Sequence, residues 1–375
     1  MAEFETRVAN LSDKRQALLA LLEQRKKAAA AAQGEPRLGV RPAGQPVPLS
    51  FGQEALWFVD QLDPGQPTYN IVQVLRLRGP LDVVALRRSF DLLVQRHEAL
   101  RTVFAVRQGR PFQHIDQGFV TATMVRDDLR HLPEEQREAE VQRLVGEEEV
   151  RRPFDLAAGP LFRTRLIVLG DEHHVLTIGV HHSVADGWSV GLLNGELSVC
   201  YGALVGGGEP VLGELPVQFG DFAVWQRDWL RGEVLERRLG YWEGCLAGVP
   251  VLELPSDRPR PVVPSYGGDV VEGVLSGSVL AGVRELARSQ GVSLFMVLAA
   301  AVKVVLSRYS GLDDVAVGTT TLGRSRPELE RLVGYFTNLV VLRTDLSGDP
   351  SFVELLGRVR DVTLGAYDNE VPFEK

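Results

Sequence analysis

The spacing of apolar positions predicts strands and helices along the whole chain, because strand side chains repeat every two residues and helical ones about every 3.6. Alternating apolar and polar residues predict strands over residues 68–77, 102–106, 112–115, 161–169, 174–182, 269–275, 315–320 and 339–344. Apolar residues at helical spacing predict helices over residues 11–33, 82–97, 133–150, 188–204, 221–229, 233–246, 280–290, 293–309 and 352–367. Since both halves mix the two kinds of element, the pattern indicates an α/β or α+β fold.

Four stretches stand out by composition. Residues 293–309 are nearly all apolar, so we expect this helix to be buried. Prolines in residues 254–268 exclude regular structure there. Residues 1–34 hold a helix with a basic polar face, which is either a solvated helix or a linker or docking helix that meets an upstream protein. Residues 35–47 are rich in proline and predict an extended linker, so the folded part is expected to begin near residue 48.

The strongest chemical signal is His181-His182-Ser183-Val184-Ala185-Asp186-Gly187, between a predicted strand and a predicted helix. Loops carried by rigid elements are where catalytic groups tend to be placed. If the strand continues through the histidine pair, the two side chains point to opposite faces, and only one of them lines a given cavity. A neutral imidazole at that position can accept a proton from an attacking nucleophile.

The residues after the histidine pair have expected supporting roles. Asp186 is placed to hold the turn, either by capping backbone amides or by pairing with an arginine elsewhere. Gly187 allows a backbone that other residues resist, and a close approach of substrate to the main chain. The alternative is that the histidines are structural, as a lone histidine on a strand usually is. No metal is expected, since His173-His174 and His181-His182 match no known ligand spacing.

The histidine stretch resembles the active-site motif of the condensation domains of nonribosomal peptide synthetases. These domains belong to the chloramphenicol acetyltransferase-like superfamily of acyltransferases. Further stretches resemble the other motifs of that family, in the same order: Leu49–Phe58, Arg96–Phe104, Phe219–Trp225, Val333–Asn338 and Asp368–Glu374. Phe219 stands where the family usually has Tyr, and the first three positions of the last motif are altered.

The resemblance implies two chloramphenicol-acetyltransferase-like lobes that form a V with a central channel, with His182 near its middle. Residues 48–218 are the expected N-terminal lobe with the histidine motif, and residues 219–375 the expected C-terminal lobe. Domains of this family normally continue for some tens of residues past the Pro-Phe-Glu motif, whereas this sequence stops at Lys375. The second lobe is therefore expected to be incomplete, and the activity of the shortened chain is a matter for experiment.

The activity implied by the resemblance is amide-bond formation in nonribosomal peptide biosynthesis, including that of antibiotics. A donor acyl or peptidyl thioester on one carrier protein reacts with an acceptor aminoacyl thioester on another. His182 is the implied general base, or the group that orients the acceptor amine. His181 and Asp186 are assigned to the scaffold of the loop, and Gly187 offers its backbone amide near the thioester.

Further residues are implied as substrate-binding or structural support. Asp186 is expected to pair with Arg96 or Arg101, although each arginine could instead be a surface charge at a helix end. Asn338 lies in a motif that borders the implied channel, where its amide can hydrogen-bond substrate, or it is a turn residue. Trp188 directly follows the histidine motif and is likewise implied as a substrate-binding or supporting residue.

Within the family, the central motif favours condensation. Heterocyclisation domains replace the histidines with aspartates, and epimerisation domains have a different order of residues after Asp-Gly. Asn70 and its neighbours favour a donor of L configuration. Two other interpretations stay open: an ester-forming acyltransferase of the same superfamily, and a non-catalytic module that recruits carrier proteins.

The composition indicates which partners and which cellular compartment to expect. Asp plus Glu number 49 against 41 Lys plus Arg, for a net charge of -8, so a nucleic-acid partner is not expected. The only two cysteines, Cys200 and Cys245, suit a reducing cytosol, and we expect a cytoplasmic protein with no membrane partner. No cofactor is expected to bind directly, because phosphopantetheine thioesters arrive on upstream and downstream peptidyl carrier proteins. An adjacent adenylation domain is a further expected partner.

Overall fold

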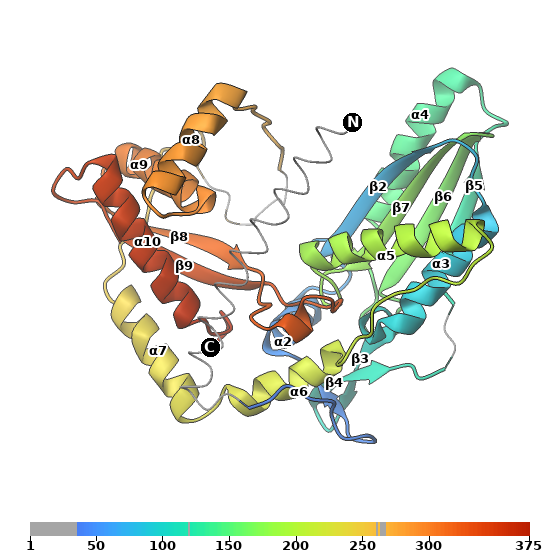
Figure 1. The fold of residues 1–375 in the computed structure, drawn as a ribbon, viewed down its shortest axis with the longest axis horizontal. Helices are drawn as coiled ribbons and strands as arrows, with labels where there is room; N and C mark the ends of the chain where they lie inside the picture. The colour runs from blue at the N-terminus through green and yellow to red at the C-terminus, as the bar shows by residue number, and fades with distance from the viewer. Residues whose placement is uncertain (1–35, 119–120, 260–261, 263–267) are drawn as a thin grey trace. The chain divides into compact units, whose positions relative to one another are not determined.

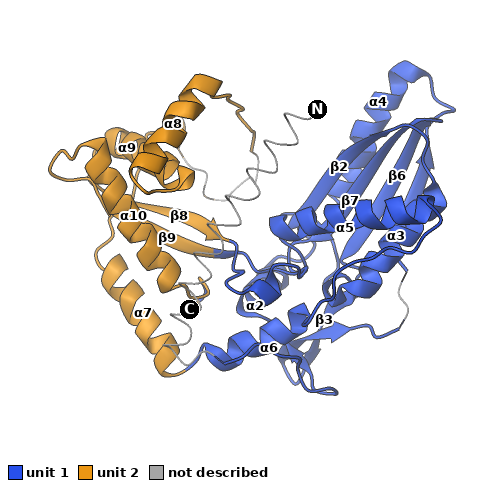
Figure 2. Cartoon of the chain, in the orientation of Figure 1, with its two compact units in different colours: residues 1–231, 322–338, 374 blue, residues 232–321, 339–373, 375 orange. Residues whose placement is uncertain are grey.

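The computed structural model describes residues 36–118, 121–259, 262 and 268–375 (Figure 1). The helix predicted over residues 11–33 lies outside these ranges. The chain divides into two compact units (Figure 2). Unit 1 comprises residues 1–231, 322–338 and 374, and unit 2 comprises residues 232–321, 339–373 and 375. The expected lobe boundary between residues 218 and 219 falls inside unit 1.

The main sheet of unit 1 has the strand order β2-β7-β6-β5 (Figure 1). These strands span Asn70–Arg78 (β2), His173–His181 (β7), Phe162–Gly170 (β6) and Met124–Asp128 (β5). β2 and β6 both run antiparallel to β7, and β5 runs parallel to β6. The register pairs Asn70 with His181, so the first residue of β2 lies beside the start of the histidine motif. The strands predicted over residues 68–77, 161–169 and 174–182 are confirmed.

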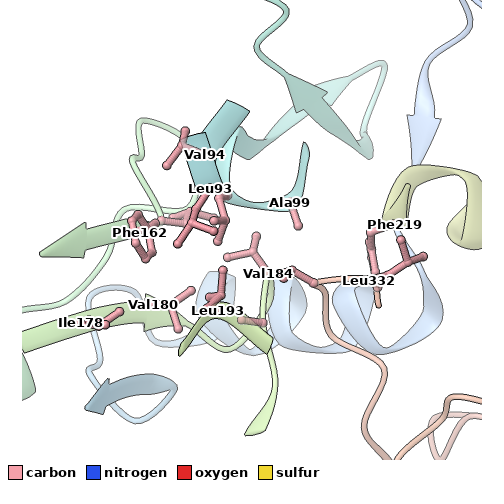
Figure 3. Packing of buried hydrophobic residues seen from close by; sticks show 14 of the residues in the cluster. Leu93, Val94, Ala99, Phe162, Ile178, Val180, Val184, Leu193, Phe219 and Leu332 are labelled. Atoms are coloured by element: carbon pink, nitrogen blue, oxygen red, sulfur yellow. The ribbon is translucent and has the colours of Figure 1, made fainter. Parts of the chain in front are cut away.

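The two central strands of this sheet are buried on both faces. Leu166, Leu176 and Ile178 belong to the largest apolar cluster of the unit, which also contains side chains of α3 (Val83–Arg96) and α5 (Gly187–Val205) (Figure 3). Ile167 and Val175 belong to a separate cluster with α4 (Glu134–Arg143) and the π-helix Leu144–Val150. The alternation of side chains along a strand therefore sorts neighbouring residues into two cores, and helices cover both faces.

The remaining elements of unit 1 frame this sheet. A smaller sheet joins β1 (Val47–Pro48), β4 (Arg110–Ile115) and β3 (Thr102–Arg107) in that order, so the strands predicted over residues 102–106 and 112–115 are confirmed and form a hairpin. The other helical segments are α2 (Phe51–Leu62), the short 3₁₀ helices Glu98–Arg101 and Pro327–Leu329, and α6 (Phe219–Trp229).

The π-helix packs a buried carboxylate against the sheet. The Arg151 amide donates to the carbonyl of Gly146, five residues earlier, which is the hydrogen bond of a π-turn. This turn places the carboxylate of Glu149 against Arg163 and Arg165 of β6, at 3.3 and 2.7 Å. The Arg163 guanidinium also lies 4.0 Å from the ring centroid of Phe154.

The proline-rich segment before β1 packs onto unit 1 instead of forming a free linker. Leu38 is buried in the main core. The indole of Trp225 donates to the carbonyl of Pro36, at 2.8 Å. Arg41 bonds the carboxylates of Asp221 and Glu98, at 2.8 and 2.7 Å. The folded part of the chain therefore begins before residue 48. Leu38 and Arg41 anchor a segment whose sequence has neither helix nor strand periodicity.

Unit 2 pairs β8 (Asp314–Thr321) with β9 (Asn338–Asp345). Its helices are α7 (Glu233–Leu246), α8 (Gly277–Ser289), α9 (Leu294–Ser310) and α10 (Phe352–Asp368), as the pattern predicted. The apolar core joins side chains of α8, α9 and α10 with Val315 of β8. Among the described residues no single helix is long and apolar enough to span a membrane; only α8 and α9 together pass that test, bent by 106°.

Two expectations for unit 2 are wrong. The strand predicted over residues 269–275 does not form: Val270, Val271 and Val274 are 79–98% exposed, and no described strand pairs with them. The helix α9 is not buried all round, since Leu298 and Val305 are exposed while Met296, Val297, Ala300 and Lys303 face the core. In both cases apolar composition identifies side chains that can be buried, but only tertiary packing decides which of them are.

Lys303 is the charged side chain inside this core. Its ammonium donates to the carbonyl of Leu342 at 2.5 Å and to the hydroxyl of Thr344 at 2.6 Å. No described carboxylate pairs with it. Burial lowers the pKa of Lys303 to about 8. Two neutral acceptors thus hold the amine, in place of a counter-charge.

We predict that Lys303→Met changes how stability depends on pH. The folded-state pKa lies below the usual lysine value, so between about pH 8 and 10 the unfolded chain binds more protons and the wild-type protein gains stability as pH rises. Urea unfolding across that range should show this gain in the wild type and a flatter dependence in Lys303→Met. The exposed Lys375→Met control should keep the wild-type dependence. Parallel curves for wild type and Lys303→Met would contradict the prediction.

Candidate functional site

The histidine motif forms the connection from β7 to α5 inside unit 1. β7 ends at His181, so His182 is the first residue past the strand and not its last. The His182 amide still donates to the carbonyl of Tyr69, at 2.8 Å, which extends the contact with the chain before β2. Asp186 then caps α5, since its carboxylate accepts from the amide of Ser189 at 2.9 Å. A strand end and a helix start thus fix the loop at both ends.

The hydrogen bonds of His182 define which ring nitrogen can act as a base. Its Nδ1 lies 2.9 Å from the carbonyl oxygen of Ala185. A carbonyl oxygen only accepts, so Nδ1 carries the proton and the lone pair of the neutral ring is on Nε2. The side chain is half-buried, whereas His181 is only 4% exposed. The geometry therefore presents one basic nitrogen from a ring whose other nitrogen is fixed to the loop.

His181 has the opposite arrangement. The Ser183 amide donates to Nδ1 of His181 at 3.2 Å, and the Ser183 hydroxyl lies 2.7 Å from the same nitrogen. The rings of Tyr69 and Phe154 meet the His181 ring in T-shaped contacts, with centroids 6.3 and 6.0 Å away. Burial, and secondly the charge of His182, lower the pKa of His181 to about 4. His181 is therefore neutral at pH 7 and enclosed, which suits a scaffold residue.

The carboxylate of Asp186 pairs with Arg324, and not with the expected Arg96 or Arg101. Arg324 donates to both carboxylate oxygens, at 2.7 and 3.0 Å, and the two side chains are 2% and 1% exposed. Burial lowers the pKa of Arg324, against the opposing effect of Asp186. The expected arginines are used elsewhere: Arg96 pairs with Glu196, and Arg101 bonds the carbonyl of Asp116.

Asp186 and Ser189 also anchor the segment that carries Arg324. The Phe336 amide donates to Asp186 at 3.1 Å, and the Gly334 amide donates to the hydroxyl of Ser189 at 3.1 Å. The Arg324 guanidinium lies 4.2 Å from the ring centroid of Phe336. The segment of residues 322–338 is therefore fixed to the start of α5 by two backbone amides and one buried ion pair.

Close packing explains two glycines, one in this segment and one on α2 that faces it. A Cβ built on Gly334 would lie 1.9 Å from the ring of Phe219, so only glycine fits there. A Cβ on Gly52 of α2 would lie 2.8 Å from Cε1 of Tyr335. The Tyr335 ring in turn meets the imidazole of His182 edge to face, with centroids 5.0 Å apart. Tyr335 thus contacts the histidine that presents the basic nitrogen.

The remaining candidate residues are Gly187, Trp188 and Asn338. Gly187 is exposed, and a Cβ there would meet nothing within 4 Å. The Trp188 indole donates to the carbonyl of Glu330 at 2.9 Å, so it supports the same segment as Arg324. Asn338 is half-buried at the start of β9, and its contact with substrate stays a prediction. Among the described residues no three His, Cys, Asp or Glu side chains group as metal ligands.

Sequence reasoning missed Arg324, Ser189 and the role of Tyr335. Arg324 lies outside every motif, in a loop between β8 and β9, so nothing in its local sequence points to Asp186. Ser189 and Tyr335 do lie within or next to recognised motifs. Their contacts depend on residues more than 100 positions away, which local periodicity does not report.

The fold and the site together define a class of protein. A half-buried histidine just past the end of a central strand, with an aspartate that caps the next helix and pairs with a buried arginine, fits the acyltransferase superfamily that the motifs resemble. The chain belongs to the condensation domain family of nonribosomal peptide synthetases: the family model described as "Condensation domain" matches residues 44–375.

Curated relatives are much longer than this chain. It is 47% identical over 336 residues to a linear gramicidin synthase subunit of Brevibacillus parabrevis, which covers 89% of this chain and 4% of the relative. It is 41% identical to the phosphinothricin tripeptide synthetase PhsC of Streptomyces viridochromogenes, over 100% of this chain and 34% of that protein. The dimodular nonribosomal peptide synthase of Bacillus subtilis is 43% identical, with 88% and 14% covered.

Solved structures agree with the mixed α/β fold. The X-domain in its complex with OxyB from teicoplanin biosynthesis is 32% identical, with a TM-score of 0.78, over 91% of this chain and 74% of that one. The first condensation domain of the calcium-dependent antibiotic synthetase is 25% identical, with a TM-score of 0.72, over 87% and 75%. SgcC5 from Streptomyces globisporus is 32% identical, with a TM-score of 0.69, over 87% and 74%.

We predict that Arg324→Met destabilises unit 1 by about 3–5 kcal/mol, because the substitution leaves a buried carboxylate without its counter-charge. Urea unfolding followed by tryptophan fluorescence measures the loss. The control is Arg343→Met, which removes a more exposed partner of Asp314, with side chains 22% and 32% exposed, and should cost much less stability. Equal losses in the two variants would show that the burial of the Asp186 pair has no special effect.

Proposed function

We propose that this chain catalyses amide-bond formation between a donor acyl or peptidyl thioester and the α-amine of an acceptor aminoacyl thioester. The observation that carries the proposal is the hydrogen bond from His182 Nδ1 to Ala185, which leaves Nε2 as the proton acceptor. Family membership supports the same reaction class. A thioester is already reactive, so the site has to position two groups and move one proton.

The proposed reaction uses His182 once as a base and once as an acid. The acceptor nitrogen attacks the donor carbonyl carbon while Nε2 takes the proton of the amine. The C–N bond forms, the C–S bond breaks, and the leaving thiolate of the donor's phosphopantetheine receives that proton. The Asp186 pair with Arg324 keeps the loop in place throughout, and His181 stays neutral behind it.

The partners follow from the chemistry and from the length of the relatives. Both thioesters are attached to phosphopantetheine, which we propose is presented by upstream and downstream peptidyl carrier proteins. The chain spans 4–7% of the length of the gramicidin synthase subunits that it matches. We therefore propose that it works within, or beside, a longer assembly that includes an adenylation domain, with no cofactor of its own.

Two structural relatives support alternative functions. SgcC5 was solved in complex with a 1,2-ethanediol derivative, so a hydroxyl acceptor and an ester product are the second candidate. The X-domain structure is a complex with OxyB, which supports a binding module as the third. The intact His182, Asp186 and Gly187 favour catalysis over binding alone. An acceptor bearing either an amine or a hydroxyl separates the first two.

We predict that His182→Ala lowers amide formation about 10²- to 10⁴-fold, because the mutant lacks the proton acceptor. The assay combines a donor-loaded and an acceptor-loaded carrier protein and detects the product by mass spectrometry. His131→Ala removes an exposed histidine and should leave the rate unchanged. Equal rates for wild type and His182→Ala would assign His182 to the scaffold. Transfer by neither protein, with either acceptor, would favour the binding module.

Gly187→Ala provides a test of substrate approach to the start of α5. The added methyl group meets no protein atom, so the free energy of unfolding should change by no more than about 1 kcal/mol. We expect the KM for the acceptor-loaded carrier protein to rise several-fold, since the methyl fills space that substrate needs. Steady-state kinetics and urea unfolding measure the two effects. Unchanged kinetics in a stable variant would remove Gly187 from the binding site.

A further inference from the structure

Tyr335 occupies a fixed position beside His182. The backbone is tied on both sides of it, because the Gly334 amide bonds Ser189 and the Phe336 amide bonds Asp186. The Phe336 side chain is buried in the main core. The Tyr335 ring is not part of that cluster, and it meets the imidazole of His182 at a centroid distance of 5.0 Å.

The ring is held from a second direction by α2. Cε1 and Cδ1 of Tyr335 lie 2.8 and 3.2 Å from the position that a Cβ on Gly52 would occupy. Edge-to-face contact between aromatic rings adds about 0.5–1.5 kcal/mol beyond the burial of their area, so it also fixes the orientation of the imidazole. The phenol is therefore a preorganised group next to the base, and not a mobile surface tyrosine.

The hydroxyl of Tyr335 has no hydrogen-bond partner among the residues that the structure describes. Burial, and then the charge of Glu374 and the effects of Tyr69 and Asp186, raise the pKa of Tyr335 to about 12. At neutral pH the group is a protonated hydroxyl that can donate. A half-buried donor with no partner among the described residues, beside a histidine whose Nε2 is left to accept, is arranged to meet an oxygen of the substrate.

We propose that the Tyr335 hydroxyl donates a hydrogen bond to the carbonyl oxygen of the donor thioester. This proposal rests on the acyl transfer proposed above. Negative charge develops on that oxygen when the amine attacks, and a donor fixed in advance stabilises it without reorganisation. The two groups have different roles in this reaction. Nε2 of His182 accepts the proton of the amine, and the Tyr335 hydroxyl binds the acyl oxygen.

The test uses acetyl-pantetheine, with pantetheine as the probe that lacks the acyl carbonyl. Protein with ¹³C at tyrosine Cζ gives one resonance for each tyrosine, and Tyr335→Phe identifies the one from Tyr335. Acetyl-pantetheine should shift this resonance in both wild type and His182→Ala, and pantetheine should not. The Kd for acetyl-pantetheine should rise about tenfold in Tyr335→Phe, which keeps the ring contacts. Tyr309→Phe, on an exposed face of α9, is the matched control.

The binding readout needs no turnover, so it decides this proposal even if the chain forms no amide. An unmoved Tyr335 resonance, an equal shift with pantetheine, or an unchanged Kd in Tyr335→Phe would overturn it. In the transfer assay, kcat should fall about tenfold in Tyr335→Phe and stay unchanged in Tyr309→Phe. Absence of transfer in the wild type would count against the proposed reaction alone, while the shifted resonance would still place an acyl oxygen at Tyr335.

Discussion

The buried ion pair between Asp186 and Arg324 is the interaction on which the site depends. A charge removed from water is costly unless it is paired and hydrogen-bonded, and here every oxygen of the carboxylate is used. One oxygen accepts from Arg324 and from the amide and hydroxyl of Ser189, and the other accepts from Arg324 and from the Phe336 amide. The start of α5, the histidine loop and the segment of residues 322–338 therefore share one electrostatic centre.

Two neighbouring histidines acquire different chemistry from their local hydrogen bonds. His181 accepts from the Ser183 amide, so its neutral ring carries a proton on Nε2, whereas His182 donates from Nδ1 to a carbonyl. Burial then keeps His181 neutral, while His182 is half-exposed. The pair thus combines an enclosed neutral imidazole with a half-exposed one whose Nε2 is available, and β7 ends between the two residues.

The sequence predicted most of the elements and the position of the histidine loop, because both are encoded locally. Periodicity located the strands of the main sheet, and the motif identified His182 and the cap at Asp186. The predictions that were wrong depend on long-range packing. They are the strand over residues 269–275, the full burial of α9 and the arginine partner of Asp186. Arg324 is 138 positions from Asp186 and stands in no motif, so the expectation fell on arginines within known motifs.

The support of the histidine loop depends on the number of residues in the π-helix before β6. An α-turn advances about 100° per residue, and the wider π-turn takes up one extra residue without rotating the residues after it. Glu149 reaches Arg163 through that turn, Arg163 lies over Phe154, and the Phe154 ring meets the His181 ring in a T-shaped contact. Deleting a single residue here would turn the carboxylate away from both arginines. The length of this helix is therefore constrained, because it keeps Glu149 in contact with the arginine that supports the His181 ring through Phe154.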